Sequence, residues 1–548
     1  MASGIMRTHS FSFIRRSRIR AATAVCAVLS LLAFGQIASA DDEGFGTFGH
    51  ISEEGERPAV PTKKPPPCTE KKKEAREPES SANPWGPVCT TMTSIVNLAP
   101  GLLVYFNNAP VFGLPGTVSG GFWDRTQLTG DWGGVRTDLA RHGFFFDAYS
   151  TSAYQDVFSG GLKTGGAVVQ NTQLSFSLDT GRAGLWSGGL IHFTVQSRYG
   201  SGPSDTFTVG SYVPQYTALV LPGPLLSSDT FPSEYYVVQS LSKQFSVLVG
   251  KFSDVFLPDQ TLFGDSYHYY FANFNLNKNP MTTNFYNPTA WGALGIWTPV
   301  TWLAIAGGPV DPNTQADNFA KDAFDGVDLF LTAVASYKIA GLPGQFSPSL
   351  TWSNKPKIDL ASPFGTLTSL SQVNQAVGVL VGSGLTNGLP INFNSDSWFA
   401  IANVSQYLYV KETAESTALK LKSGQPLNGI GVFARVGYAP ADSNTVATDA
   451  SVALIAHGIL DTRQYDSFGF GFYWNRISGD LKNDITLLTA GMASAKNEAG
   501  IEVFYDYAIT PAIRLIPSYQ HVWNPLIAQV SQNRSDADIF LARLNVAF

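Results

Sequence analysis

The sequence contains few groups of residues that could make or break covalent bonds. Asp265, Ser266 and His268 are the residue types of a hydrolase, but no nucleophile elbow surrounds the serine. The stretch from Gly130 to Arg136 is glycine-rich, yet it lacks the Gly-Lys-Ser/Thr ending of a phosphate-binding loop. The seven histidines are scattered without the spacing of metal ligands. We therefore predict no catalytic residue, no metal site and no cofactor.

A different chemistry is suggested by polar side chains that recur at every second position of the chain. Guanidinium, carboxylate and amide groups are planar, and they can form paired hydrogen bonds with neighbouring hydroxyls of a solute. The arginines among them could instead belong to a ladder with carboxylates along a wall. The candidates that share a polar face are Asp147, Gln155, Asn171, Gln173, His192, Gln196, Arg198, Arg435, Arg514 and Arg543.

Three tryptophans could complement these polar groups. The apolar side of a solute ring can stack on an aromatic face, and Trp132, Trp352 and Trp398 are the candidates for this contact. The alternative is that these tryptophans anchor the chain at a lipid interface, where tryptophan is enriched in membrane proteins.

The elements that must position these residues are short segments in which apolar and polar residues alternate. In the last one, Phe540 and Leu544 fall on one side, while Arg543 and Asn545 fall on the other. Gly, Pro, Asn and Asp separate such segments from about residue 120 onward. A period of two places each set of residues on one face of a β-sheet. The sequence therefore predicts an all-β fold.

Two kinds of sheet protein alternate in this way, a soluble sandwich and a membrane barrel. Only 14% of the residues are charged, whereas soluble proteins contain about 25%. The polar faces carry Arg and Asp beside Gly, as a water-filled lumen would, and aromatic residues gather at the ends of the apolar faces. The final segment reaches Phe548, and a barrel must close its last strand against its first. These features favour a transmembrane antiparallel β-barrel.

The length of the chain sets the size of this barrel only loosely. Residues 121–548 accommodate about 16 strands with long outer loops. Fourteen or eighteen strands would fit nearly as well. A barrel of this size encloses an aqueous channel, which makes passage of a solute the obvious role.

The N-terminal region differs from the predicted barrel. Residues 1–40 have the basic start, short apolar run and Ala-Ser-Ala ending of a secretory signal peptide. Residues 41–120 form a Pro/Lys-rich leader and linker that we predict to be periplasmic and flexible, at least in part. A disulfide between Cys68 and Cys89 is plausible there, because the compartment is oxidising.

Several segments resemble the OprB-type carbohydrate-selective porins. The most specific is the stretch Leu128–Ala140, which reads LTGDWGGVRTDLA and is followed by Gly143. The other similar segments are Phe144–Gly161, Val249–Phe252, Gly431–Tyr438, Phe468–Trp474 and Glu502–Phe548. Together the likeness spans about residues 122–548. The long leader with two cysteines departs from the usual pattern of the family.

The resemblance implies a sixteen-stranded barrel in the bacterial outer membrane that admits small sugars by passive diffusion and is not an enzyme. It implies outer-membrane lipid, sugars and the barrel assembly machinery as partners, with Phe548 as an assembly signal and a homo-oligomer as a possibility. The acidic balance, with 36 Lys and Arg against 42 Asp and Glu, argues against nucleic acid. The alternatives are a general or anion-selective pore and, less favoured, a barrel hydrolase.

Overall fold

We describe the protein from a computed structural model of the chain. Cys68 and Cys89 lie outside the described residues, so the signal peptide, the leader and the disulfide stay predictions. All described residues belong to one compact unit, Phe45–Phe548. The structure describes residues 118, 120–200, 209–213, 229–253, 261–263, 266–285, 289–314, 325–365, 369, 371–373, 375–376, 391–422 and 426–548.

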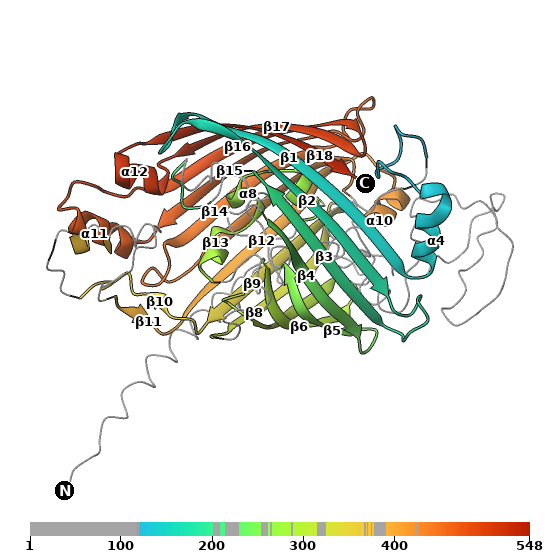
Figure 1. The fold of residues 1–548 in the computed structure, drawn as a ribbon, viewed down its shortest axis with the longest axis horizontal. Helices are drawn as coiled ribbons and strands as arrows, with labels where there is room; N and C mark the ends of the chain where they lie inside the picture. Colours follow the sequence, from blue (N-terminus) through green and yellow to red (C-terminus); the bar gives the residue numbers. More distant parts are fainter. Residues whose placement is uncertain are drawn as a thin grey trace, which may run out of the picture. The chain divides into compact units, whose positions relative to one another are not determined.

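Sixteen antiparallel strands close into a barrel, as Figure 1 shows. Each strand pairs with its neighbours in the chain, and the last pairs with the first, which confirms the predicted antiparallel barrel of about 16 strands. Closure leaves no row of unpaired backbone groups at an open edge. The strands are β1 (Phe144–Gly160), β2 (Gly165–Asp179), β3 (Gly189–Tyr199), β4 (Asp229–Ser240), β5 (Phe245–Ser253), β6 (Thr289–Val300), β7 (Leu303–Val310), β8 (Asp328–Ile339), β9 (Leu342–Ser353), β12 (Ser397–Val410), β13 (Gly429–Tyr438), β14 (Val446–His457), β15 (Ser467–Ile477), β16 (Glu498–Thr510), β17 (Ile513–Trp523) and β18 (Asp536–Ala547).

Short helices lie before β1 and in the links between strands, and one small sheet lies in a link. Among the described residues, no helix is long and apolar enough to cross a membrane. The small sheet pairs β10 (Lys357–Ile358) with β11 (Phe393–Asn394). The helices are η1 (Trp132–Gly134), α4 (Val135–Arg141), α7 (Ser266–Tyr269), α8 (Phe274–Asn277), η2 (Pro280–Asn284), α10 (Ala414–Lys422), α11 (Gly479–Leu488) and α12 (Leu526–Gln532).

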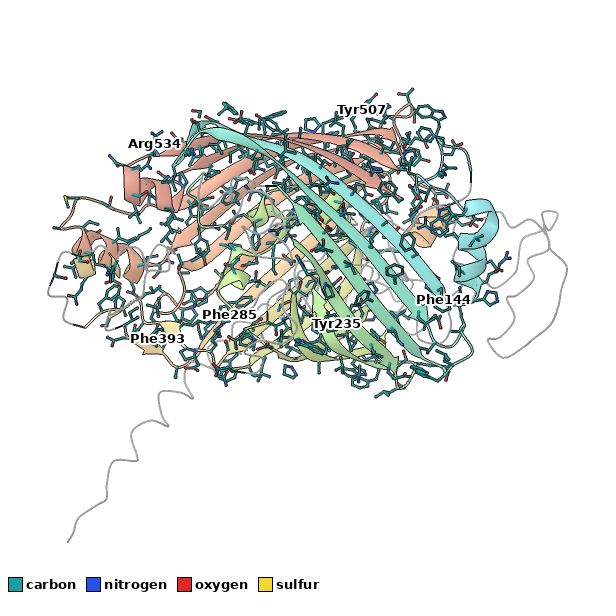
Figure 2. All side chains as sticks on the ribbon, in the orientation of Figure 1. Phe144, Tyr235, Phe285, Phe393, Tyr507 and Arg534 are labelled. Atoms are coloured by element: carbon teal, nitrogen blue, oxygen red, sulfur yellow. The ribbon has the colours of Figure 1, made fainter. Side chains whose placement is uncertain are left out.

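The two ends of the barrel differ. At the short-turn end, the links β4–β5, β6–β7, β8–β9 and β16–β17 contain only two to four residues, and α4 and α10 lie at the same end. At the opposite, long-loop end lie most of the longer links, among them those with α11 and α12. Figure 2 labels two exposed aromatic residues, Phe144 and Tyr507, on different strands at the short-turn end. Aromatic side chains at this level are typical of a membrane interface.

Along each strand the side chains alternate between the two faces of the barrel wall. In β15, Phe468, Phe470 and Phe472 are exposed on the outer face, while Gly469 and Gly471 face the interior. The same alternation runs through β18, where outward Phe540 lies between buried Ile539 and Leu541 and outward Leu544 lies between buried Arg543 and Asn545. The period of two in the sequence therefore corresponds to the inner and outer faces of the wall.

The interior is more apolar than the wet polar lumen that the alternation predicted. Part of the link between β5 and β6 packs inside the barrel, and we call its described residues, 261–263 and 266–285, the inner segment. Its α8 lies against β14 and β15. Phe263 and Phe271 of the inner segment pack against Phe433 and Phe504 of the wall. Burying these rings offsets the entropy lost when the segment is ordered.

Glycines on the inner face of the wall make room for the inner segment. A Cβ atom on Gly471 would lie 2.6 Å from Leu276 Cδ1 and 3.0 Å from the ring of Phe271. A Cβ on Gly431 would collide with the ring of Phe263. The glycines of β15 thus allow the inner segment to pack closely against the inner face of the wall. Our interpretation of these glycines as part of a water-lined face was wrong.

Candidate functional site in the barrel interior

All ten predicted polar residues lie on the inner face of the wall, where each is at most 4% exposed. The structure divides them into two groups. Arg435, Arg514 and Arg543 belong to β13, β17 and β18. The other seven lie together on the adjacent strands β1, β2 and β3, and they are Asp147, Gln155, Asn171, Gln173, His192, Gln196 and Arg198. Their role in binding a solute stays a prediction.

The register of β1, β2 and β3 arranges this second group in rows. Gln173 of β2 lies opposite Tyr149 of β1 on one side and Gln196 of β3 on the other. In the next row, Asn171 lies opposite Arg198. Side chains directly opposite each other on a sheet are about 5 Å apart at Cβ. The rows therefore place several amides and a guanidinium on one continuous surface, which we call the polar wall.

Several amide atoms of the polar wall have no hydrogen-bond partner among the described residues. They are both side-chain polar atoms of Gln155, both of Gln196, and Oε1 of Gln173. A buried polar atom without a partner costs about 1–3 kcal/mol. Hydroxyl groups of a solute can both donate and accept hydrogen bonds, so they could satisfy these amides.

His192 is held in a hydrogen-bonded network at the edge of the polar wall. Its Nδ1 lies 2.8 Å from Ser177 Oγ, and its Nε2 lies 2.9 Å from Thr194 Oγ1. Its ring stacks on Tyr236 with the ring centres 4.7 Å apart. The carboxylate of Glu234 is 4.0 Å from His192 Nε2 and accepts a hydrogen bond from a backbone N–H of β5. These contacts fit a wall residue with two neutral hydroxyl partners.

Our sequence analysis missed Glu234 and Tyr236, which both face the interior. The register of β3 and β4 shifts between Thr194 and Val195, next to Pro232. This irregularity interrupts the period-two pattern of β4, and a simple alternation count therefore misplaces its residues.

The three arginines of the other group interact with the inner segment or with nearby carboxylates. Arg435 Nη1 donates to the carbonyl oxygen of Leu276 at 2.6 Å, and Arg543 Nη2 donates to that of Tyr270. Arg514 forms an ion pair with Asp506 of β16. A charged side chain that bonds a backbone carbonyl in a buried site fixes the position of that backbone. Arg435 and Arg543 therefore hold the inner segment against the wall, and the guanidinium carbon of Arg514 lies 4.8 Å from the ring centre of Tyr269 in the same segment.

A buried carboxylate of the wall also binds the inner segment. Glu502 of β16 accepts hydrogen bonds from the backbone N–H groups of Ala272, at 2.9 Å, and of Asn273, at 2.8 Å. The sequence analysis did not single out Glu502 or the inner segment. A usable signal was the asparagine at every second position from 273 to 279. Three of them bond strand residues, because Asn273 Nδ2 donates to Gln520, Asn279 Nδ2 donates to Asp449, and Asn275 Oδ1 accepts from Asn475.

Comparisons with known proteins agree with this architecture. The chain matches the family model described as "Carbohydrate-selective porin, OprB family" over residues 163–548. The chain belongs to this family. The likeness found in the sequence is thereby confirmed, although its most specific motif, at 128–140, precedes the matched residues. The protein is therefore an outer-membrane β-barrel through which sugars pass.

A solved structure resembles the porin in fold. The high-pH structure of Pseudomonas putida OprB has a TM-score of 0.64 and 17% sequence identity, covering 78% of this chain and 100% of that chain. The low-pH structure of Pseudomonas putida OprB has a TM-score of 0.45 and 14% identity, covering 78% and 99%. A search of curated proteins gave no match.

The family places the two ends of the porin relative to the membrane. Short turns of outer-membrane barrels face the periplasm, and longer loops face the cell exterior. The short-turn end, with α4, is therefore periplasmic, and the links with α11 and α12 face outward. The outer face of the wall, with Phe468, Phe470 and Phe472, contacts lipid.

The three tryptophans predicted to stack on a solute do not face the interior of the porin. Trp352 and Trp398 are cross-strand partners on the outer face, and Trp398 packs 5.7 Å from Tyr438 between ring centres. Trp132 is 43% exposed beside α4 and packs against Phe146. They therefore correspond to the alternative of lipid-interface anchors.

The glycine-rich motif before β1 bonds both the first strand of the barrel and the residue that follows the last strand. Arg136, in α4, is 1% exposed, and its guanidinium donates to the carbonyl oxygens of Phe548, at 3.0 Å, and Phe146, at 2.7 Å. It also lies 3.5 Å from Asp147 Oδ1. Asp131 accepts hydrogen bonds from the backbone N–H and hydroxyl of Thr137. Arg136 of this motif thus links β1 to the end of β18, where the barrel closes.

Proposed function

We propose that the porin recognises small sugars at the polar wall of β1, β2 and β3. The observation that carries this proposal is the set of buried amide atoms of Gln155, Gln173 and Gln196 without partners among the described residues. A sugar presents adjacent hydroxyls that suit planar amides and a guanidinium. The neighbouring rings of Tyr149 and Tyr236, which also face the interior, offer apolar contact.

In this mechanism, the sugar moves by diffusion between the polar wall and the inner segment. The hydrogen bonds replace part of its hydration, and they must be weak enough for release as well as strong enough for entry. Since the polar-wall side chains are at most 4% exposed, a sugar reaches them only when neighbouring groups move aside. We infer that sugar passage is coupled to small motions of the interior.

We infer that transport requires no catalytic step. His268, one of the hydrolase residue types in the sequence, stacks its ring on Tyr149 with the ring centres 4.7 Å apart. Its backbone carbonyl accepts a hydrogen bond from Asn545. These contacts support a role in holding the inner segment against the wall. Asp265 lies outside the described residues.

Replacing both Gln173 and Gln196 by alanine should weaken sugar binding without unfolding the barrel. A hydrogen bond contributes about 1 kcal/mol, so we expect the half-saturation concentration for sugar to rise about fivefold per lost amide contact. Inhibition of single-channel current by glucose measures this constant. Gln170→Ala, on the outer face of the same strand, is the matched control and should leave it unchanged. An unchanged constant in the double variant would remove these amides from the site.

A general or anion-selective pore is the competing function. Strong anion selectivity needs unpaired positive charge in the lumen. Arg514 is paired with Asp506, and Arg136 lies beside Asp147, so part of the inward positive charge is neutralised. We therefore expect a reversal potential near zero under a potassium chloride gradient. We also expect liposomes containing the porin to admit monosaccharides faster than amino acids of equal size. A large anion-selective potential together with equal rates would favour the competing function.

We also propose that the barrel assembly machinery inserts the porin, with Phe548 as part of the signal that it recognises. In the folded barrel the backbone N–H of Phe548 donates to the carbonyl oxygen of Ala148 at 2.9 Å. Phe548→Ala should therefore slow insertion in cells more than it lowers the stability of the refolded barrel. Pulse-labelling of membrane-inserted protein measures the rate of insertion. Equal insertion rates for Phe548→Ala and the unaltered porin would contradict the proposal.

A further inference from the structure

A cavity at the periplasmic rim of the barrel lies apart from the polar wall and the inner segment. It is formed by the link between β14 and β15, by the turn between β16 and β17, and by Trp123 from the chain before α4. Its volume is about 250 Å³. Pockets for drug-sized molecules measure about 300–1,000 Å³. The size of this cavity therefore suits a single small ring.

The chain before α4 is held at this rim by its backbone. The N–H of Leu128 donates to the carbonyl oxygen of Ala547 at 2.8 Å, at the periplasmic end of β18. Arg125 Nη2 donates to the carbonyl oxygen of Leu128 at 2.6 Å. Because β18 pairs with β17, Trp123 reaches the turn that precedes β17 although the two are far apart in sequence.

An ion pair with two parallel hydrogen bonds fixes the wall of the cavity. Nε and Nη2 of Arg463 donate to the two carboxylate oxygens of Asp466, each at 2.9 Å. Asp466 Oδ1 also accepts from the backbone N–H of Ala508 at 3.1 Å, and Arg463 Nη2 donates to the carbonyl oxygen of Ala508 at 2.9 Å. These bonds join the β14–β15 link to β16. The cavity therefore has its shape before any ligand enters it.

Trp123 presents an apolar ring at this cavity. The residue is 67% exposed, and its ring meets that of Phe122 at 88°, with the ring centres 5.0 Å apart. Apolar surface in contact with water is unfavourable, so a ligand with an apolar face would gain by covering the indole.

The charges around the cavity are paired. Asp461 forms an ion pair with Lys411 from the link after β12, and Asp466 forms one with Arg463. The two carboxylates are thereby largely neutralised, which leaves little net charge to attract a cation or an anion. The cavity is therefore suited to a neutral ligand.

The remaining groups of the cavity form hydrogen bonds without charge. Thr462 and Gln464 are exposed there, and Gln464 Nε2 makes one long hydrogen bond, of 3.4 Å, to the carbonyl oxygen of Asp461. A hydroxyl and an amide can each donate and accept, as the hydroxyls of a sugar require. An aromatic face beside such groups matches a sugar ring, which has one C–H side and a polar edge.

We propose that this cavity is a second binding site for a monosaccharide, which stacks on Trp123 and bonds Thr462 and Gln464 after it has crossed the barrel. The proposal rests on the passage of sugars through the porin and does not require binding at the polar wall. Binding at the exit must be weak enough for the sugar to leave into the periplasm.

A phospholipid headgroup fits the cavity less well. Arginine recognises phosphate through paired N–H groups, but Nε and Nη2 of Arg463 already bond Asp466 and Ala508. A glycan strand of the cell wall presents the same kind of ring, but a cavity of about 250 Å³ suits one ring rather than a chain of them.

Fluorine NMR of the refolded porin, labelled with fluorotryptophan, tests this proposal. Trp123→Phe and Trp186→Phe assign the two signals. We expect the Trp123 signal to shift with added glucose and to reach saturation, whereas the Trp186 signal should stay in place. Trp186 is the matched control, because it is 47% exposed in the link between β2 and β3 at the same end of the barrel. No shift at Trp123, or equal shifts of both signals, would overturn the proposal.

Two variants separate the rim cavity from the polar wall. Gln464→Ala should raise the glucose concentration for the half-maximal Trp123 shift about fivefold, as expected for one lost hydrogen bond. Gln173→Ala combined with Gln196→Ala should leave that concentration unchanged, even if these amides bind sugar inside the barrel. The proposal is wrong if the polar-wall variant abolishes the Trp123 shift or if Gln464→Ala leaves it unaltered. Unheated gel mobility shows that each variant is folded.

Two further probes identify the class of ligand in the same titration. Glycerophosphoethanolamine represents a phospholipid headgroup, and tri-N-acetylglucosamine represents a cell-wall glycan. We expect both to shift the Trp123 signal only at higher concentrations than glucose. Tighter binding of either probe would overturn the assignment of the cavity to a transported monosaccharide.

Discussion

Replacing Arg136 by alanine is expected to destabilise the closed barrel more than any other single change near its seam. The guanidinium is 1% exposed and bonds the carbonyl oxygens of Phe146 and Phe548 while it lies beside Asp147. Alanine would remove a hydrogen-bond donor from the carbonyl oxygens of Phe146 and Phe548 and a positive charge from beside the carboxylate of Asp147. Breaking a buried charged pair in this way costs about 3–5 kcal/mol. The midpoint of urea unfolding of the refolded porin measures the effect.

Two further variants separate this role from a general effect on α4. Arg141 is exposed on the same helix, and Arg141→Ala should shift the urea midpoint little. Arg136→Lys keeps the charge but cannot bond two carbonyl oxygens with one planar group, so we expect an intermediate midpoint. If Arg136→Ala and Arg141→Ala had the same midpoint, Arg136 would not hold the first and last strands of the barrel together.

Replacing Gly471 by valine is expected to displace the inner segment and enlarge the channel. The new Cβ would lie 2.6 Å from Leu276 Cδ1 and 3.0 Å from Phe271, which are both buried in the apolar interior. Inserting atoms into a packed core costs about 1–3 kcal/mol, and here the segment can move away more easily than the wall. We expect larger single-channel currents and weaker inhibition by sugar.

The matched control for this change lies on the other face of the wall. Ala434→Val adds the same kind of atoms to the outer face of β13, next to lipid, and should leave conductance unchanged. The unheated gel mobility of Gly471→Val should match that of the unaltered porin, which shows that the barrel is closed. A folded Gly471→Val variant with unchanged conductance would mean that the inner segment does not limit the channel.

The contrast between β18 and β4 shows which strands could be interpreted from the sequence. In β18 the alternation is uninterrupted, so Arg543 and Asn545 could be assigned to the inner face by counting. In β4 the register shift beside Pro232 breaks the count, and Glu234 was missed. Local periodicity predicts a face only where the strand is regular.

The distinction between residues that anchor the inner segment and residues that we propose to contact a solute could not be made from the sequence. Arg435 and Gln173 both occupy inward positions of regular strands, but Arg435 bonds Leu276, whereas Gln173 Oε1 has no partner among the described residues. The difference depends on the inner segment, which is far from both in sequence. The tryptophans illustrate the same limit, because Trp352 and Trp398 lie on the outer face.

By itself, the sequence determined that the protein is built of β-strands with two distinct faces, because a period of two acts residue by residue along each strand. The low content of charged residues then favoured a membrane barrel over a soluble sandwich. The stretch Leu128–Ala140 pointed to the family. Only the tertiary structure decided that the inner segment packs against Gly431 and Gly471 and that Arg136 reaches Phe548. These contacts join residues that are hundreds of positions apart or lie in an irregular link, and no local pattern encodes which wall such a link will pack against.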